Sequence, residues 1–218
     1  YGLVKPKPLL IYIYGIFGAF LLSGLWVYKK EFANSRILYR SEIENSTTSP
    51  VIGEIVFEPA AGDNVIIFGK ESRTLIAEQF RELRTNINYL LQSDVNGKVL
   101  LMTSSIPGEG KSFVSINLAA SFAFSGKRTA LVEFDLYKPK VCEGLGVNYK
   151  AGITDFFQGQ ATLEKICHPY SKIPNLRVVP AGTPLTNPAE LILNGKLPGL
   201  IDYLKTEFDF IIIDSPAI

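Results

Sequence analysis

The sequence predicts an α/β fold in which a mostly parallel β-sheet is flanked by helices, with one membrane-spanning helix in front of it. Three observations lead to this prediction. Short apolar runs, typical of buried strands, alternate with helical patterns from residue 99 onward. A glycine-rich turn joins the first of these runs to the helical pattern that follows it. Near the N-terminus, 20 consecutive residues carry no charge.

The uncharged stretch, residues 9–28, predicts a transmembrane helix. As a helix it would span about 30 Å, the thickness of the hydrocarbon core of a bilayer. Tyr12, Tyr14, Trp26 and Tyr28 cluster near its ends, where aromatic residues favour the membrane interface. Basic residues are more numerous after it than before it, which favours a cytoplasmic C-terminal side. The alternatives are a signal peptide, which would need a cleavage site that is not evident, and a buried core helix.

This helix would divide the chain into unequal parts. Residues 1–8 would end a periplasmic region, residues 29–73 would form a cytoplasmic connector, and residues 74–218 would form an incomplete globular domain. Within the connector, residues 41–55 are compatible with a short helix, a turn and a strand. Residues 58–63 have the proline and glycine content of a linker. We expect the natural protein to continue beyond both ends of the sequence.

Residues 74–91 predict an amphipathic helix, because apolar residues recur along them at helical spacing. Glu78, Arg81 and Arg84 follow one another on one flank at intervals of three residues. Such a flank forms either a solvated row of ion pairs, each worth about a few tenths of a kcal/mol, or a contact with another subunit. From these residues alone we favour the solvated row.

The glycine-rich turn reads Ser-Ile-Pro-Gly-Glu-Gly-Lys-Ser over residues 105–112. It lies between an apolar run, residues 99–102, and a helical pattern, residues 113–122. This is the strand–loop–helix setting of a phosphate-binding P-loop, although Ser105 stands where the usual pattern has its first glycine. The fold class is therefore that of the P-loop NTPases.

Each residue type in this loop suits a bound phosphate. Gly108 and Gly110 permit close approach of the backbone, and N–H groups at the start of the helix attract an anion. Lys111 would neutralise the phosphates, and the Ser112 hydroxyl would ligate Mg²⁺. The predicted nucleotide-binding residues are Ser105, Pro107, Gly108, Glu109, Gly110, Lys111, Ser112 and Phe113.

Two further strand-like runs end in acidic residues: residues 129–135 at Asp135 and residues 208–214 at Asp214. Parallel α/β sheets bind ligands outside the carboxyl ends of their strands. We therefore expect both aspartates beside the glycine-rich loop, rather than as surface caps. The remaining elements predicted are a strand at 176–180 and helices at 152–157, 189–193 and 197–207.

Composition narrows the class of partner. The formal net charge of +1 indicates no strong electrostatic steering toward nucleic acid, and a hydrophobic content of 47% does not indicate bulk disorder. Cys142 and Cys167 lack the spacing of a metal-binding pair, so we expect free thiols in a reducing cytosol. His168, the only histidine, is expected to be a loop residue.

These residues resemble one protein family along nearly the whole chain. Two segments are similar to the second transmembrane segment of chain-length-determinant (polysaccharide co-polymerase) proteins: Lys5-Pro-Lys-Pro8 before the membrane run, and Ser41 with Gly53-Glu-Ile55 after it. The later motifs resemble the cytoplasmic domain of bacterial tyrosine kinases (BY-kinases). They are Glu78-x-x-Arg81-x-x-Arg84, residues 107–112, residues 133–139, Pro180-Ala-Gly182, Asn187-Pro-Ala-Glu190 and Ile213-Asp-Ser-Pro216.

The resemblance implies a protein-tyrosine autokinase that uses ATP and Mg²⁺ and regulates the chain length and export of capsular or exopolysaccharides. It implies a bacterial inner-membrane location, with the kinase domain in the cytoplasm. The implied partners are the polysaccharide polymerisation and export machinery, a tyrosine phosphatase, and further copies of the chain in a ring-like homo-oligomer.

Residue roles follow from the same resemblance. The implied catalytic residues are Lys111, Glu133, Asp135 and Asp214, and the implied Mg²⁺ ligands are Ser112, Asp135 and Asp214. The resemblance also assigns Glu78, Arg81 and Arg84 to contacts between subunits, which reverses the preference for a solvated row.

This chain departs from the family at one motif. Glu133 stands where the family has the first acid of D-x-D, and Tyr137 stands at the basic position that follows. Two other functions compete with the kinase. One is a non-enzymatic co-polymerase that uses its nucleotide domain as a scaffold. The other is a Min/Par-type ATPase, whose signature lysine is replaced here by Ile106.

Overall fold

The computed structural model describes residues 8–32, 40–57, 66, 74–91, 97–184, 190 and 195–217. The chain divides into two units, Tyr1–Val51 and Ile52–Ile218. The linker expected at 58–63, and most of the helix expected at 189–193, lie outside the described residues.

The first unit contains two helices, α1 (Pro8–Phe32) and α2 (Arg40–Ser46). The part of α1 over Leu9–Lys30 is long and apolar enough to cross a membrane, and none of it is buried in protein. A core helix of a soluble domain would instead bury its apolar side chains. In α2, Arg40 forms an ion pair with Glu44 one turn later.

The second unit is built on a five-stranded sheet of order β1-β5-β2-β4-β3. Four strands are parallel and the short edge strand β3 is antiparallel to β4. The strands are β1 (Lys98–Met102), β2 (Thr129–Glu133), β3 (His168–Pro169), β4 (Leu176–Val179) and β5 (Phe210–Asp214). The predicted α/β class is confirmed.

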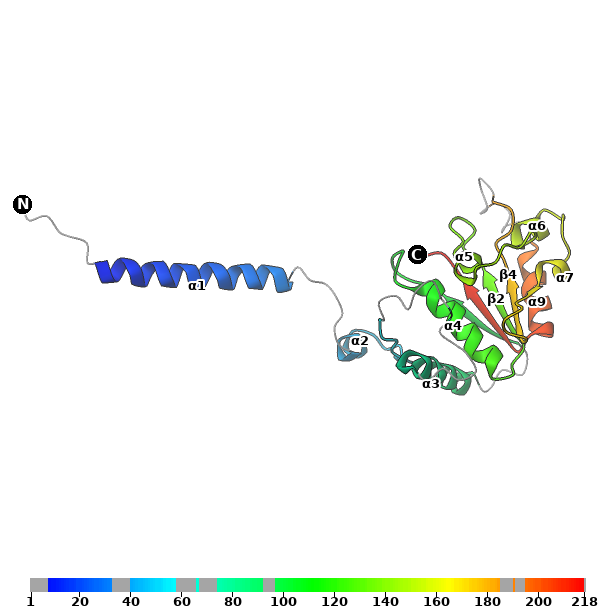
Figure 1. Ribbon diagram of the computed structural model, residues 1–218, viewed down its shortest axis with the longest axis horizontal. Coiled ribbons are helices and arrows are strands. Elements are labelled where there is room, and N and C mark those ends of the chain that lie inside the picture. Colours follow the sequence, from blue (N-terminus) through cyan, green and yellow to red (C-terminus); the bar gives the residue numbers. More distant parts are fainter. Residues whose placement is uncertain are drawn as a thin grey trace, which may run out of the picture. The chain divides into compact units, whose positions relative to one another are not determined.

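Helices cover both faces of this sheet (Figure 1). On one face lie α3 (Leu75–Leu90) and α4 (Lys111–Phe124), and on the other lies α9 (Leu197–Glu207). Three further short helices lie among the described residues of this unit: α5 (Val141–Leu145), α6 (Ile153–Phe157) and α7 (Leu163–Ile166).

Alternation along the central strand explains the two-sided core. In β5, Phe210 and Ile212 pack with α3 and α4, whereas Ile211 and Ile213 pack with the α9 side. Phe210 stacks on Phe122 of α4 with ring centroids 3.8 Å apart. Every residue of β5 is buried, so both faces of the strand carry apolar side chains. This explains why its sequence is a continuous apolar run that ends at Asp214.

The strand expected as the last part of residues 41–55 is not formed. Residues 50–57 carry no strand, and residues 52–57 lie along α3. Asn86 Nδ2 donates to the Ile52 carbonyl oxygen over 2.8 Å, and the Val56 N–H donates to Gln79 Oε1 over 3.0 Å. Ile52 and Ile55 pack against the core. Side chains of α3 therefore satisfy backbone groups that a neighbouring strand would otherwise have paired.

Candidate functional site

The strand register brings three carboxyl ends to the same level of the sheet. Asp214 at the end of β5 is level with Met102 of β1 on one side and with Glu133 of β2 on the other. Beyond β1, the chain forms the glycine-rich loop and enters α4 at Lys111. Parallel strands thus place the loop and the acidic strand ends at one edge, where α/β sheets bind their ligands.

The loop needs two of its glycines for their backbone conformation. Gly108 and Gly110 have φ of 94° and 90°, in the left-handed region that other residues avoid. Gly110 is the N-cap of α4, so the next N–H groups begin the helix. Glu109 Oε2 accepts hydrogen bonds from the Ser105 and Ile106 N–H groups over 3.0 and 3.3 Å.

Asp214 joins the end of β5 to the start of α4. Lys111 Nζ lies 2.8 Å from its Oδ1, and the Ser112 hydroxyl donates to its Oδ2 over 2.7 Å. The Ser115 hydroxyl lies 3.0 Å from Oδ1. The ion pair is buried, since the Lys111 and Asp214 side chains are 11% and 1% exposed. Sequence reasoning missed Ser115, although its position one helical turn after Lys111 was a usable signal.

Asp135 follows β2 and lines the same pocket as the loop. Its Oδ1 accepts from the N–H groups of Tyr137 and Lys138 over 3.3 and 3.0 Å, which fixes the turn after the strand. Among the described residues, Oδ2 of Asp135 makes no hydrogen bond. This oxygen is available to a ligand in the pocket.

Glu133 is placed differently from the catalytic position that the resemblance implied. It is 1% exposed and does not line the pocket. Its Oε1 accepts from the N–H groups of Val141 and Cys142 over 2.6 and 3.3 Å. Its Oε2 accepts from the Ala181 N–H over 3.3 Å. Both carboxylate oxygens therefore accept hydrogen bonds from backbone N–H groups, and the carboxylate does not face the glycine-rich loop.

The pocket at this edge has a volume of about 430 Å³. Most of the predicted nucleotide-binding residues line it, whereas Ser105 and Glu109 do not. Sequence reasoning did not predict the basic residues Lys138 and Lys140 there. The complete lining is Ser104, Pro107, Gly108, Gly110, Lys111, Ser112, Phe113, Asp135, Tyr137, Lys138, Lys140, Pro216 and Ala217.

The residues present suit a hard cation that is shared with a phosphate. Hydroxyl and carboxylate oxygens from Ser112, Asp135 and Asp214 are ligand types that Mg²⁺ prefers. Within the described ranges, no three acidic, histidine or cysteine side chains form a cluster able to hold a metal ion alone. Mg²⁺ typically binds through one or two carboxylates together with substrate phosphates, and this site fits that pattern.

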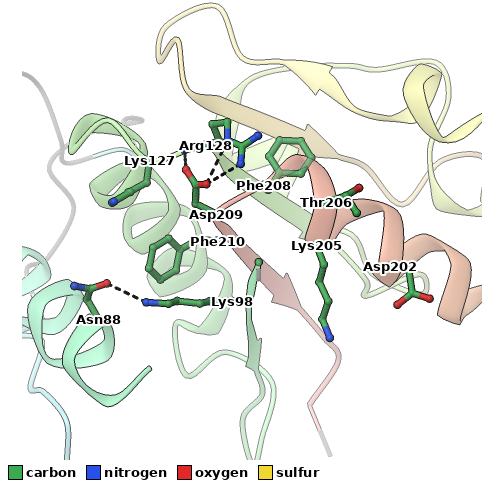
Figure 2. A pocket seen from close by; sticks show the side chains of 11 residues that line it. Asn88, Lys98, Lys127, Arg128, Asp202, Lys205, Thr206, Phe208, Asp209 and Phe210 are labelled. Carbon is green, nitrogen blue, oxygen red and sulfur yellow. Dashed lines mark hydrogen bonds and ion pairs between the residues drawn. The ribbon is translucent and has the colours of Figure 1, made fainter. Parts of the chain in front are cut away.

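A larger pocket, of about 650 Å³, lies at the opposite, amino edge of the sheet. Figure 2 shows Lys98, Lys127, Arg128 and Lys205 around it. Helices α3, α4 and α9 end near this edge, and basic residues there compensate the partial negative charge of helix C-termini. Asp209 pairs with Arg128 over 2.8 Å. We therefore assign these charges a structural role.

The flank of α3 uses its charges within the chain. Glu78 pairs with Arg81 on the same helix. Arg84 Nη1 donates to the Ser121 carbonyl oxygen of α4 over 2.8 Å. Burial, together with the nearby Arg81 charge, lowers the pKa of Arg84 from its usual value. Arg84 thus helps to dock α3 on α4, a role that the sequence did not reveal.

The two cysteines and the histidine lie outside the pocket. Cys142 and Cys167 are free thiols. Burial raises the pKa of Cys167 to about 11, and burial together with Glu133 raises the pKa of Cys142 further. His168 lies in β3 rather than in a loop, stacks on Tyr149 and bonds through Nε2 to the Ala151 carbonyl oxygen over 2.7 Å.

Known proteins resemble this chain in sequence and in fold. A family model described as an AAA domain matches residues 97–218, more than half of the chain. The chain is 28% identical to a tyrosine-protein kinase, ptk, of Acinetobacter johnsonii over 99% of its own length, and 30% identical to the tyrosine-protein kinase wzc of Salmonella typhimurium over 100%. The chain belongs to the bacterial tyrosine-kinase family. It spans only 30% and 32% of the length of these two relatives.

A solved structure supports the same family assignment for this chain. The BceF tyrosine kinase domain is 28% identical and superposes with a TM-score of 0.71. The match covers 83% of this chain and 77% of the other. The similarity therefore includes most of the sheet and its helices, not the glycine-rich loop alone.

Proposed function

We propose that this chain carries the nucleotide site of an ATP-dependent protein-tyrosine kinase. The observation that carries the proposal is the buried contact of Asp214 with Lys111 and Ser112. It joins the end of a central strand to the phosphate-binding loop. Membership of the bacterial tyrosine-kinase family supports the reaction type, and the pocket supports the nucleotide.

Nucleotide binding would exchange the partner of Lys111. In the structure Lys111 is held by Asp214. A bound triphosphate would offer the ammonium group stronger negative charge, and the N–H groups at the start of α4 would bind the phosphate oxygens. Lys138 and Lys140 line the same pocket and add positive charge. Asp214 would then be released for a second task.

That second task would be to hold Mg²⁺ together with Ser112 and Asp135. Mg²⁺, when bound, neutralises the phosphate charge that develops during transfer. The acceptor tyrosine hydroxyl would attack the γ-phosphorus, the bond from this phosphorus to the β–γ bridging oxygen would break, and ADP would leave. Asp135 would act on Mg²⁺ through water, which would leave its Oδ2, free of hydrogen bonds within the described residues, able to accept the hydroxyl proton.

The setting of the kinase is proposed from its relatives. Helix α1 would anchor the chain in the bacterial inner membrane, with residues 1–8 outside, 29–73 as connector and 74–218 in the cytoplasm. The domain would regulate polysaccharide polymerisation and export, and a tyrosine phosphatase would remove the phosphate groups that it adds. Glu78 and Arg81 would contact neighbouring subunits in a ring, while Arg84 would hold the α3 surface in place.

The nucleotide site is tested by ATP titration of the whole chain in detergent, with wild type beside Lys111→Met. We expect Mg²⁺-dependent ATP binding in the wild type and a large loss in the variant. Equal binding by both proteins would refute the assignment of Lys111 and of the pocket.

A further inference from the structure

We propose that Glu133 is a positioning residue, which fixes Asp135 in the pocket and does not itself touch nucleotide or Mg²⁺. The inference rests on the proposed nucleotide site and deepens it. It concerns the segment 134–140, which leaves β2, forms one side of the pocket and returns to the start of α5.

Both ends of this segment are tied at the sheet edge. At its start, the Phe134 N–H donates to the Asp214 carbonyl oxygen over 2.8 Å, which extends the pairing of β2 with β5. At its end, the N–H groups of Val141 and Cys142 donate to Glu133. A side chain from one end of the segment therefore binds the backbone at the other end, and closes it into a loop.

Asp135 lies within this closed loop and depends on it. Its Oδ1 holds the Tyr137 and Lys138 N–H groups, so its free Oδ2 is aimed by the same short turn. In Glu133→Gln, one of the two acceptor oxygens would become an NH2 donor, so the carboxamide could not accept from both the α5 backbone and the Ala181 N–H, and the loop that carries Asp135 would be held less firmly. Glu133 also binds the Ala181 N–H after β4, which ties the loop to a second strand end.

The length of the side chain matters for this role. Glu133 is the last residue of β2, and its carboxylate reaches both the start of α5 and the residue after Pro180. An aspartate at the same backbone position would be one methylene shorter. The departure from D-x-D thus has a structural counterpart: the first acid is used to hold the loop and the second faces the pocket.

The test measures Mg²⁺-dependent binding of fluorescently labelled ADP to the full chain in detergent. The variants are Glu133→Gln, Glu133→Asp, Asp135→Asn and the Gln/Asn double variant. We expect Glu133→Gln to weaken the Mg²⁺-dependent affinity about 10- to 100-fold, the usual effect of removing a group that orients a metal ligand. Mg²⁺-free binding should change less than Mg²⁺-dependent binding, because Lys138 and Lys140 lie in the same loop but do not depend on the direction of Asp135. In the Asp135→Asn background, Glu133→Gln should change the affinity less than about twofold.

A matched control separates positioning from general stability. Asp155 is another buried carboxylate, 6% exposed, that accepts from backbone N–H groups, at Gly152 and Thr183, and does not line the pocket. Asp155→Asn should lower the thermal stability of the protein and leave its Mg²⁺-dependent affinity unchanged. Glu133→Asp keeps the charge, and it replaces Glu133→Gln in the binding measurement if that variant does not fold. Its affinity should lie below the wild-type value.

Four results would overturn the inference. Normal Mg²⁺-dependent affinity in Glu133→Gln with loss of phosphoryl transfer would make Glu133 a chemical base. Independent losses in the double variant would show that Glu133 does not act through Asp135. Wild-type affinity in Glu133→Asp would show that the length of the Glu133 side chain is not needed to hold the loop. Absence of nucleotide binding by the wild type would refute the proposed site itself, and would be visible before any variant is compared.

Discussion

Replacing Asp214 by alanine should destabilise the protein strongly even without nucleotide. The change leaves Lys111, only 11% exposed, without its partner 2.8 Å away. Two unit charges at this distance attract by about 6 kcal/mol at an effective dielectric constant of about 20. Desolvation offsets part of this energy, and removing one member of a buried pair costs about 3–5 kcal/mol. The Ser112 and Ser115 hydroxyls lose an acceptor as well.

The assay is thermal unfolding of the whole chain in detergent, followed by circular dichroism. For a unit of this size, the loss corresponds to a fall in Tm of about 10 °C. Asp209→Ala is the matched control, because Asp209 also lies 2.8 Å from a cation, Arg128, but the two side chains are 37% and 59% exposed. Solvent screens that pair, and its loss should change Tm little. Equal effects of the two variants would refute the reasoning that burial makes the Asp214 pair important.

Two further predictions concern the rest of the fold. The pKa values of Cys142 and Cys167 are raised, the latter to about 11, so both thiols stay protonated at pH 7–8. Maleimide should therefore label them slowly in the folded protein and rapidly in urea. Rapid labelling of the native protein would contradict this. Gly152→Ala should cost at least about 2 kcal/mol of unfolding free energy, because its new Cβ would lie 2.3 Å from the Pro180 carbonyl oxygen and 2.4 Å from the Gly182 nitrogen. The control, Gly199→Ala in α9, meets no atom within 4 Å and should be neutral or stabilising, as measured by urea unfolding.

Strand ends were the part of the site that sequence could predict. Apolar runs located β1, β2 and β5 within one or two residues. Parallel strands also explain why Asp135 lines the pocket and why Asp214 contacts Lys111 and Ser112 of the loop. Long helices such as α3 and α4 were equally readable from their apolar spacing.

Side-chain direction was not predictable in the same way. Glu133 and Asp135 lie two residues apart, yet one binds the backbone of α5 and the other faces the pocket, because the strand ends between them. The error at residues 51–55 has a similar origin, since Asn86 and Gln79 on α3 supplied the hydrogen bonds that a strand would need. Short elements such as α5, α7 and β3 contain too few residues to show a period.

Lys111 and its pocket are proposed to support transfer of phosphate from ATP to tyrosine. The most direct measurement is phosphotyrosine on the full-length natural protein, incubated with ATP and Mg²⁺, beside the same protein carrying Lys111→Met. We expect a strong signal in the wild type that the substitution removes. An equal signal in both proteins, or none in a wild type that binds ATP, would contradict kinase activity and favour a nucleotide-binding scaffold.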